Sequence, residues 1–250
     1  MFFSKKVTPS QNAQAIIDYL GCKCEYFPPC YDESKLLAHY KRVCEQGLKE
    51  GFTPVIINPD ETLAEWLTDI SCDGMTPEEF RRDILSRSSE GGKEFFEKLA
   101  RSRMEDNVCD EITEEELFAD FCDGEPMTSF GGYRNYQDGS LTETILAYIP
   151  TSKPYEVFAW VPFGGWNECP DAEDMIKVAR YWYEEYKVIP AVISHDTLEF
   201  RAMPLEKDTA IKIAKEQYEL CPDIVDQGIG TIGALAHSLT QSTVWFFWWD

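Results

Sequence analysis

The chain has 250 residues, of which 44% are hydrophobic and 14% aromatic, so it is long and apolar enough to bury a substantial core. Its 45 Asp and Glu residues outnumber 23 Lys and Arg residues, which gives a formal net charge of −22. Nucleic acids and anionic membranes bind clustered Lys and Arg, so we expect neither among the partners. A basic protein partner or a cation fits this charge better, although the ordinary effect of such acidity is solubility.

The nine cysteines do not form the pattern of a disulfide-stapled protein, because their number is odd and the chain is large. No signal peptide is recognisable at the start, and no run of eighteen apolar residues occurs. We therefore expect a cytoplasmic protein with reduced thiols.

The first sixty residues predict a β-α-β unit preceded by a helix. Ser10 is a candidate N-cap and Gly21 a stop signal for that first helix. A strand over 24–27, a helix up to Gly51 and a buried strand over 54–57 follow. This order predicts that the two strands are parallel.

Helices dominate the next segment. Asp60 opens one helix, the capping box Thr76-Pro77-Glu78-Glu79 opens a second, and a third runs through Phe95, Phe96 and Leu99. Residues 105–125 contain ten acids and no Lys or Arg. They include a second capping box, Thr113-Glu114-Glu115-Glu116, before a helix that turns Leu117, Phe118 and Phe121 inward.

The second half predicts alternating strands and helices. Strands are expected over 145–149, 155–161, 189–194, 197–203 and 244–249, and helices after Pro170-Asp171, over 210–221 and over 232–239. Only His195-Asp196 separates two of the strands, so a tight hairpin is expected there. Leu198, Phe200 and Ala202 should face one way, and Glu199 and Arg201 the other.

These elements predict an α+β protein with two domains. Residues 1–135 form a helix-rich α/β domain with one β-α-β unit and the acidic segment, and residues 136–250 form an α+β domain. From Tyr155 onward the order is β-α-β-β-α-β, with a helical insertion before the last strand. This is the ferredoxin-like split β-α-β arrangement, to which one strand is added. The last strand is apolar on both faces and lies at a sheet edge. Its second face needs a cover, for which the N-terminal domain is the simplest candidate, then a dimer partner, then a ligand.

Three segments of the second half carry a family resemblance: Gly164-Gly165-Trp166-Asn167-Glu168-Cys169-Pro170, Cys221-Pro222-Asp223-Ile224-Val225-Asp226-Gln227-Gly228 and Trp245-Phe246-Phe247-Trp248-Trp249-Asp250. Over about residues 144–250 the chain resembles an uncharacterised bacterial family catalogued as domain of unknown function 4253. The segment 51–57 is more loosely similar to the N-terminal part of that family. The resemblance implies a fold boundary and no reaction.

A first candidate site follows the helix of residues 210–221, where Cys221, Asp223, Asp226 and Gln227 stand close in sequence. Two carboxylates three residues apart on one helical face suit a metal ion or a general base. The structural alternative is that Pro222-Asp223 starts a short helix, that Asp223 or Asp226 caps it, and that Gln227-Gly228 ends it.

Other motifs are weaker. Gly164-Gly165-Trp166-Asn167 precedes a helix, where phosphate can bind, but it lacks phosphate-loop spacing and acids surround it, so a tight packing turn is favoured. Cys22-Lys23-Cys24 with Cys30 lacks the spacing and the second pair of a zinc site. The three histidines are scattered, and His195 is interpreted as an exposed turn residue.

The leading functional hypothesis is a non-enzymatic protein-interaction module for a basic protein partner, without cofactor or metal. The alternative is a hydrolase or metal-dependent enzyme that uses acids near Asp223 and Asp226. No catalytic residue or oligomeric state is assigned. The candidate site residues are Trp166, Asn167, Glu199, Cys221, Asp223, Asp226 and Gln227. A pocket that gathers them favours the enzyme, whereas a flat apolar patch favours the binding module.

Overall fold

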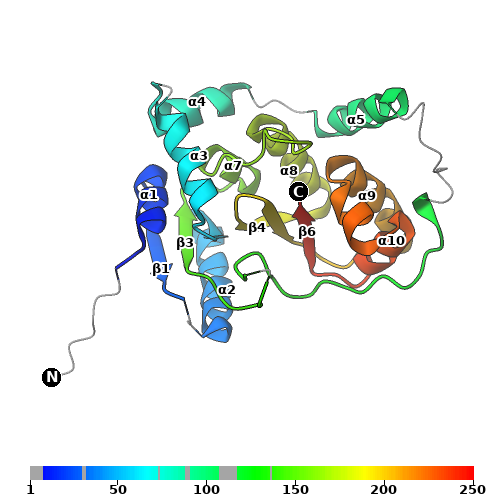
Figure 1. Ribbon diagram of the computed structural model, residues 1–250, viewed down its shortest axis with the longest axis horizontal. Coiled ribbons are helices and arrows are strands. Elements are labelled where there is room, and N and C mark those ends of the chain that lie inside the picture. Colours follow the sequence, from blue (N-terminus) through cyan, green and yellow to red (C-terminus); the bar gives the residue numbers. More distant parts are fainter. Residues whose placement is uncertain (1–7, 30–31, 73, 88–90, 107–116, 136) are drawn as a thin grey trace.

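One mixed sheet organises the protein. The computed structural model describes residues 8–29, 32–72, 74–87, 91–106, 117–135 and 137–250. Within these ranges six strands pair in the order β1-β3-β2-β4-β5-β6 (Figure 1). They are β1 (Cys24–Phe27), β2 (Thr53–Ile57), β3 (Thr144–Ile149), β4 (Ile189–Ile193), β5 (Thr197–Arg201) and β6 (Val244–Trp248). Helices pack on the sheet, so the predicted α+β class is confirmed.

The first helix begins and ends at its predicted signals, and the second ends at its predicted glycine. Helix α1 (Gln11–Leu20) starts at Ser10, whose hydroxyl accepts a hydrogen bond from the Ala13 N–H at 3.0 Å, and ends at Gly21. Helix α2 (Glu33–Glu50) ends at Gly51. Both glycines have a positive φ, which costs glycine little and other residues more.

Three helices follow β2: α3 (Glu61–Cys72), α4 (Pro77–Arg87) and α5 (Gly92–Asp106). The first capping box is confirmed, because the Glu79 N–H donates to Thr76 Oγ1 at 3.2 Å and the Thr76 N–H donates to Glu79 Oε2 at 2.8 Å. The second capping box lies outside the described residues. Beyond it, Leu117, Phe118 and Phe121 pack half-buried against the core.

The β-α-β prediction needs one correction. Strands β1 and β2 run in the same direction, but β3 lies between them and is antiparallel to both, with Ala147 opposite Cys24 on one side and Val55 on the other. The strand that separates them, β3, begins at Thr144, long after β2 ends at Ile57, so local order could not reveal it. Strands from both sides of residue 135 thus share one sheet, and the boundary does not separate two sheets. The division into two domains remains a prediction.

The predicted strand over 155–161 is wrong. Those residues form a 3₁₀ turn, η1 (Pro154–Glu156), and a short helix, α7 (Val157–Trp160). Val157, Phe158 and Ala159 are all fully buried. A short apolar run buried on every side has the same pattern in a strand and in a helix, which explains the error.

The ferredoxin-like arrangement is not confirmed. Its expected first strand is the helical segment just described. The last three strands instead lie side by side in chain order, because β5 pairs antiparallel with both β4 and β6. The hairpin at His195-Asp196 and the final strand are confirmed.

The remaining helices are α8 (Ala172–Tyr186), α9 (Lys207–Leu220), the π-helical turn η2 (Ile224–Ile229) and α10 (Ile232–Leu239). Asp171 caps α8, as the Pro170-Asp171 signal indicated, by accepting the Asp174 N–H at 2.9 Å. The short helix after Asp223 is present, but it ends at Gly230 (φ 89°) instead of Gly228.

The main core lies between one face of the sheet and most of the helices, with Trp182 of α8 near its centre. The Trp182 ring stacks on Phe247 of β6 at 5.5 Å and on Phe96 of α5 at 5.7 Å. Helix α2 covers part of the opposite face, where Tyr40 and Val43 join a smaller core with Ile56 of β2. In Figure 1, α9 and α10 lie beside β6, and α1 lies beside β1.

The edge strand β6 divides its aromatic side chains between the two faces, as predicted. Trp245 and Phe247 are buried in the main core, whereas Phe246 and Trp248 are half-buried on the other face. The strand's free edge is covered at its start, where the Thr243 and Val244 N–H groups donate to the Met127 carbonyl. The edge is thus protected by the segment that precedes the predicted boundary.

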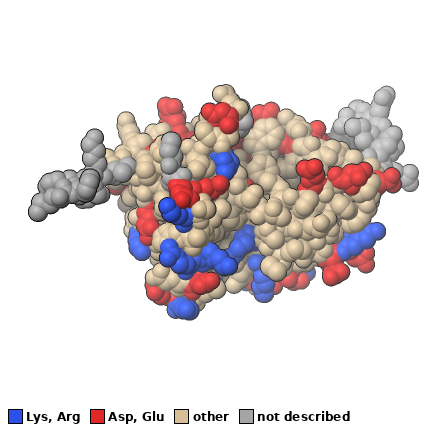
Figure 2. Space-filling view, turned by 90° about the horizontal axis from the view of Figure 1, so that it is seen from below, with Lys and Arg blue, Asp and Glu red and all other residues tan. Residues whose placement is uncertain are grey.

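Charge is unevenly distributed over the surface. In Figure 2, Lys and Arg side chains gather mainly on the left half of the face shown, while Asp and Glu side chains are spread across it. Exposed Lys and Arg on α2 are Lys35, Lys41, Arg42 and Lys49. No helix in the described ranges is long and apolar enough to cross a membrane.

Candidate functional site

A cleft of about 1280 Å³ opens at one end of the sheet. Strands β2 and β4 are parallel neighbours, with Ile57 opposite Ile193, and both end at this cleft. The carboxyl ends of adjacent parallel strands are where α/β sheets commonly bind ligands. The walls come from the start of α3, the segment 131–143, the turn 162–166, the hairpin 194–197 and the end of β6.

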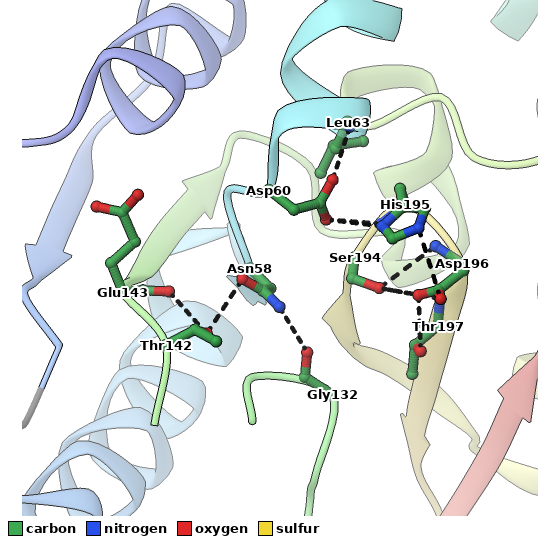
Figure 3. Close-up of polar contacts among 10 residues, drawn as sticks. All are labelled: Asn58, Asp60, Leu63, Gly132, Thr142, Glu143, Ser194, His195, Asp196 and Thr197. Atoms are coloured by element: carbon green, nitrogen blue, oxygen red, sulfur yellow. Dashed lines mark hydrogen bonds and ion pairs between the residues drawn. The ribbon is translucent and has the colours of Figure 1, made fainter. Parts of the chain in front are cut away.

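His195, in the hairpin after β4, lies between two carboxylates (Figure 3). Its Nδ1 is 3.1 Å from Asp60 Oδ2, and its Nε2 is 3.5 Å from Asp196 Oδ2. The close contact with Asp60, and then the charges of both carboxylates, raise the pKa of His195 above its ordinary value, although partial burial opposes this. The side chain of His195 is 40% exposed, so a molecule in the cleft can reach it.

Backbone contacts hold Asp60 in place. Its Oδ1 accepts the Leu63 N–H at 2.8 Å, which caps α3, and its Oδ2 accepts the His195 N–H at 3.1 Å. One carboxylate therefore fixes both the start of a helix and the position of the hairpin. The sequence predicted that Asp60 opens a helix, but gave no indication of its second contact.

Hydrogen bonds join the residues of the hairpin. The Ser194 hydroxyl donates to Asp196 Oδ1 at 2.8 Å and accepts the Thr197 N–H at 3.0 Å. The Thr197 hydroxyl donates to the same Asp196 oxygen at 3.0 Å. Asp196 Oδ1 is thus occupied, whereas Oδ2 faces His195 at a distance longer than a typical hydrogen bond.

A second polar group joins the segment 131–143 to β2. The Asn58 side-chain amide donates to the Gly132 carbonyl at 3.2 Å, and its Oδ1 accepts the Thr142 hydroxyl at 3.1 Å (Figure 3). Glu143 also lines the cleft, but its carboxylate turns toward Ser10 and Tyr26, whose hydroxyls donate to it. Asn58 therefore fixes one wall of the cleft.

Tryptophans form the apolar part of the cleft. Trp66 of α3 is 39% exposed, and Trp166 and Trp248 are half-buried. The Trp66 ring lies against Gly165, where an added Cβ would sit 3.9 Å from it. The neighbouring Gly164 has φ 84° and lies so close to the Pro170 carbonyl that a Cβ would overlap it. The predicted packing turn is thus present and forms a wall of the cleft.

Of the residues that the sequence proposed as a site, only Trp166 lines this cleft. Three others hold the end of the chain in place. The Asn167 side chain donates to the Asp250 carbonyl at 2.7 Å, Asp223 Oδ2 accepts the Asp250 N–H at 3.1 Å, and the Cys221 thiol donates to the Trp248 carbonyl at 3.0 Å. Burial raises the pKa of the Cys221 thiol to about 12, so it is a poor nucleophile.

Asp226 and Gln227 are exposed on η2. The Gln227 side chain donates to Asp223 Oδ1 at 2.9 Å, and Asp223 makes no side-chain cap to η2. The expected capping by Asp223 is therefore corrected: its carboxylate is used by a residue 27 positions later in the chain. Among the described residues, no group of three His, Cys, Asp or Glu side chains is placed to hold a metal ion.

Glu199 lies apart, on the sheet face below the segment 131–143. It is fully buried, and its two oxygens accept the N–H groups of Gly131 and Gly132 at 2.8 and 3.0 Å. Burial raises its pKa to about 7, and the two N–H groups lower it in part. Both glycines line the cleft, so Glu199 positions a wall without touching the interior.

The sequence interpretation missed Asn58, Asp60, Trp66 and His195 as site residues. The available signal was the position of two polar segments, 58–60 and 194–196, each directly after a buried strand. Recognising it required the knowledge that β2 and β4 are neighbours.

The fold and this site define an α+β protein with a ligand-sized cleft at the carboxyl ends of two parallel strands. Residues 145–250 match the family model described as Domain of unknown function (DUF4253), which confirms the family resemblance. The match starts in β3 and includes the hairpin, but it omits β2 and α3, which supply Asn58, Asp60 and Trp66. Neither a curated protein nor a solved structure gives a match to the chain.

Proposed function

We propose that the protein is a binding module that takes a small organic ligand, or a side chain of a partner, into the cleft at the ends of β2 and β4. The observation that carries this proposal is the cleft itself, a cavity of about 1280 Å³ in which exposed tryptophan and a few fixed polar groups meet. Ligand sites combine these features, whereas a flat apolar patch suits a protein surface. The interaction module expected from the sequence is therefore proposed to act through a concave site.

The fixed walls support this proposal. The hairpin, the start of α3 and the segment 131–143 are joined by hydrogen bonds through Asp60 and Asn58. A site that is already formed loses less conformational entropy when it binds. We keep the cytoplasm as the proposed location, because Cys22, Cys24, Cys44, Cys122, Cys169 and Cys221 are free thiols.

An enzymatic role is the second candidate, and the pairing of Asp60 with His195 favours it. A histidine oriented by a carboxylate and open to a cleft can transfer protons at neutral pH. If the protein is an enzyme, His195 takes the acid–base role that the sequence suggested for acids near Asp223 and Asp226. Turnover of a bound compound by the wild type, lost in Asp60→Asn, would distinguish the enzyme from the binding module.

Blocking the cleft tests the proposal. Thr62 and Glu65 are both exposed on α3, but only Thr62 lines the cleft. We expect a screen of small organic compounds to yield ligands that raise the melting temperature of the wild type through mass action. Thr62→Trp should abolish that rise, and the matched variant Glu65→Trp should retain it. Ligands that stabilise both variants equally, or a screen without ligands, would contradict the proposal.

A further inference from the structure

The charged residues around the cleft favour a ligand of one charge sign. Its described lining contains Asp60, Asp196, Asp250 and Glu143, the last with its carboxylate turned toward Ser10 and Tyr26, and a single Lys or Arg, Arg134. The Arg134 guanidinium is already used, because it pairs with Glu33 and donates to the Gly139 carbonyl at 2.8 Å. The cleft therefore has an excess of negative charge, in a protein whose formal net charge is −22.

The position beside His195 already accommodates a positive charge. The imidazolium form of His195 is held by Asp60 on one side and Asp196 on the other. Asp196 Oδ2 lies 3.5 Å from His195 Nε2, and the side chain of Asp196 is 29% exposed. A carboxylate oxygen in a partly desolvated cleft is a suitable partner for an ammonium or guanidinium group.

The aromatic wall is an independent observation that points to the same ligand class. Trp66 lies against Gly165, the residue before Trp166, and both tryptophans line the cleft. Tryptophan faces attract cations and also bury apolar groups. Carboxylates beside aromatic rings form the combination that recognises organic ammonium groups.

We infer that the ligand is an organic cation, with its positive group beside Asp60 and Asp196 and its apolar part along Trp66 and Trp166. This inference rests on the proposed function, because it names the class of molecule that the cleft binds. His195, when positively charged, then competes with the ligand for the two carboxylates. When it is protonated it repels the ligand, and when it is neutral the negative charges of Asp60 and Asp196 attract the cation without that opposition.

Three probes with the same ring test the charge preference: benzyltrimethylammonium, benzyl alcohol and benzenesulfonate, titrated calorimetrically at pH 8. We expect the cation to bind at least about tenfold more tightly than the sulfonate, with the alcohol between them. If the alcohol binds as tightly as the cation, the inferred charge preference is wrong, but the proposal that the cleft binds ligands is retained. If no probe binds, both fail.

A matched pair of variants locates the effect. Asp60 and Asp32 both cap helices by accepting an N–H three residues later, but only Asp60 lines the cleft. Asp60→Asn should weaken binding of the cation about three- to tenfold and leave the alcohol unchanged, whereas Asp32→Asn should change neither. Melting temperatures of both variants show whether the fold is retained. Equal effects of the two variants would overturn the inference.

The pH dependence provides a second measurement. Asp60 and Asp196 face His195 directly, and Glu143, Asp250 and Arg134 line the same cleft. Benzyltrimethylammonium keeps its charge at every pH, so its affinity should rise by about threefold or more from pH 6 to pH 8.5 as His195 loses its proton. His195→Gln should bind the cation more tightly than the wild type at pH 6 and show no such rise. A rise in affinity with pH that persists in His195→Gln would contradict the competition between His195 and the ligand.

The cation can belong to a free molecule or to a basic partner protein. A parallel titration with a short arginine-containing peptide, and with its glutamine analogue, distinguishes the two sources. Tighter binding of the free cation indicates a small-molecule ligand, and tighter binding of the arginine peptide indicates a partner's side chain. An arginine peptide and a glutamine peptide that bind equally would count against the inference.

Discussion

At the scale of single residues, Glu199 shows how a buried carboxylate can shape a site that it does not touch. It is fully buried below the segment 131–143, where its carboxylate accepts two backbone N–H groups. The cost of burying its charge exceeds what the two N–H groups return, and this holds its pKa near 7. The proton of Glu199 is thus coupled to the wall formed by Gly131 and Gly132.

This coupling predicts a pH-dependent stability. The pKa of Glu199 is raised from 4.5 to about 7 on folding, so its contribution is full below pH 4.5 and is lost as the pH rises to about 7. Glu199→Gln cannot ionise. Over this window the wild type should therefore lose about 2 to 4 kcal/mol of stability relative to the variant. Urea unfolding of both proteins from pH 4.5 to pH 8 measures the difference, and parallel profiles would refute the prediction.

The properties of single residues in the sequence identified only part of the site. Trp166 was among the proposed residues, because its Gly-Gly turn is recognisable in the sequence. The structure places it in the cleft. Asp60 and His195 were recognised only as a helix opener and a turn residue. They are 135 positions apart, and the pairing of β2 with β4 brings them together, so no local pattern records their contact.

At the scale of elements, caps and glycine stops located most of the helices, because these signals act over four residues and need no tertiary information. The segment 154–160 was misassigned, since it is short and buried on all sides. The partners of β1 and β2 were also missed. Their shared neighbour, β3, depends on contacts between distant parts of the chain.

The two faces of β6 give a prediction about this element. Phe247 is fully buried between the rings of Trp182 and Trp249, whereas its neighbour Phe246 is half-buried on the cleft side. Phe247→Ala should therefore lower the free energy of unfolding by about 3 to 5 kcal/mol, because it leaves a cavity in the core. Phe246→Ala should cost roughly 1 to 2 kcal/mol. Chemical denaturation measures both values, and equal losses would show that the two faces do not differ.

At the scale of the whole molecule, the sheet joins the two halves of the chain. Strand β2, from the first half, pairs with β3 on one side and β4 on the other. Both of those strands lie in or at the start of the region that matches the family model, whereas β2 does not. Composition and element order suggested a boundary near residue 135, but they carry no information about which strands become neighbours.

The position of β2 predicts how fragments behave. A fragment of residues 136–250 lacks the strand between β3 and β4 and leaves their backbone groups unpaired, which is costly in a buried sheet. We expect this fragment to show no cooperative thermal transition alone, and to regain one when it is co-expressed with residues 1–135. A sharp transition of the isolated fragment would show that the second half folds independently.

The tryptophan indole signals provide the most direct test of the cleft as the binding site. Trp66 and Trp166 line it, whereas Trp182 and Trp245 are buried in the main core. In a ¹H–¹⁵N spectrum of the protein titrated with benzyltrimethylammonium, we predict that the Trp66 and Trp166 signals shift with one saturable affinity. The Trp182 and Trp245 signals should stay in place. Saturable shifts confined to tryptophans outside the cleft, or no saturable shift in any of the seven tryptophans, would contradict the account.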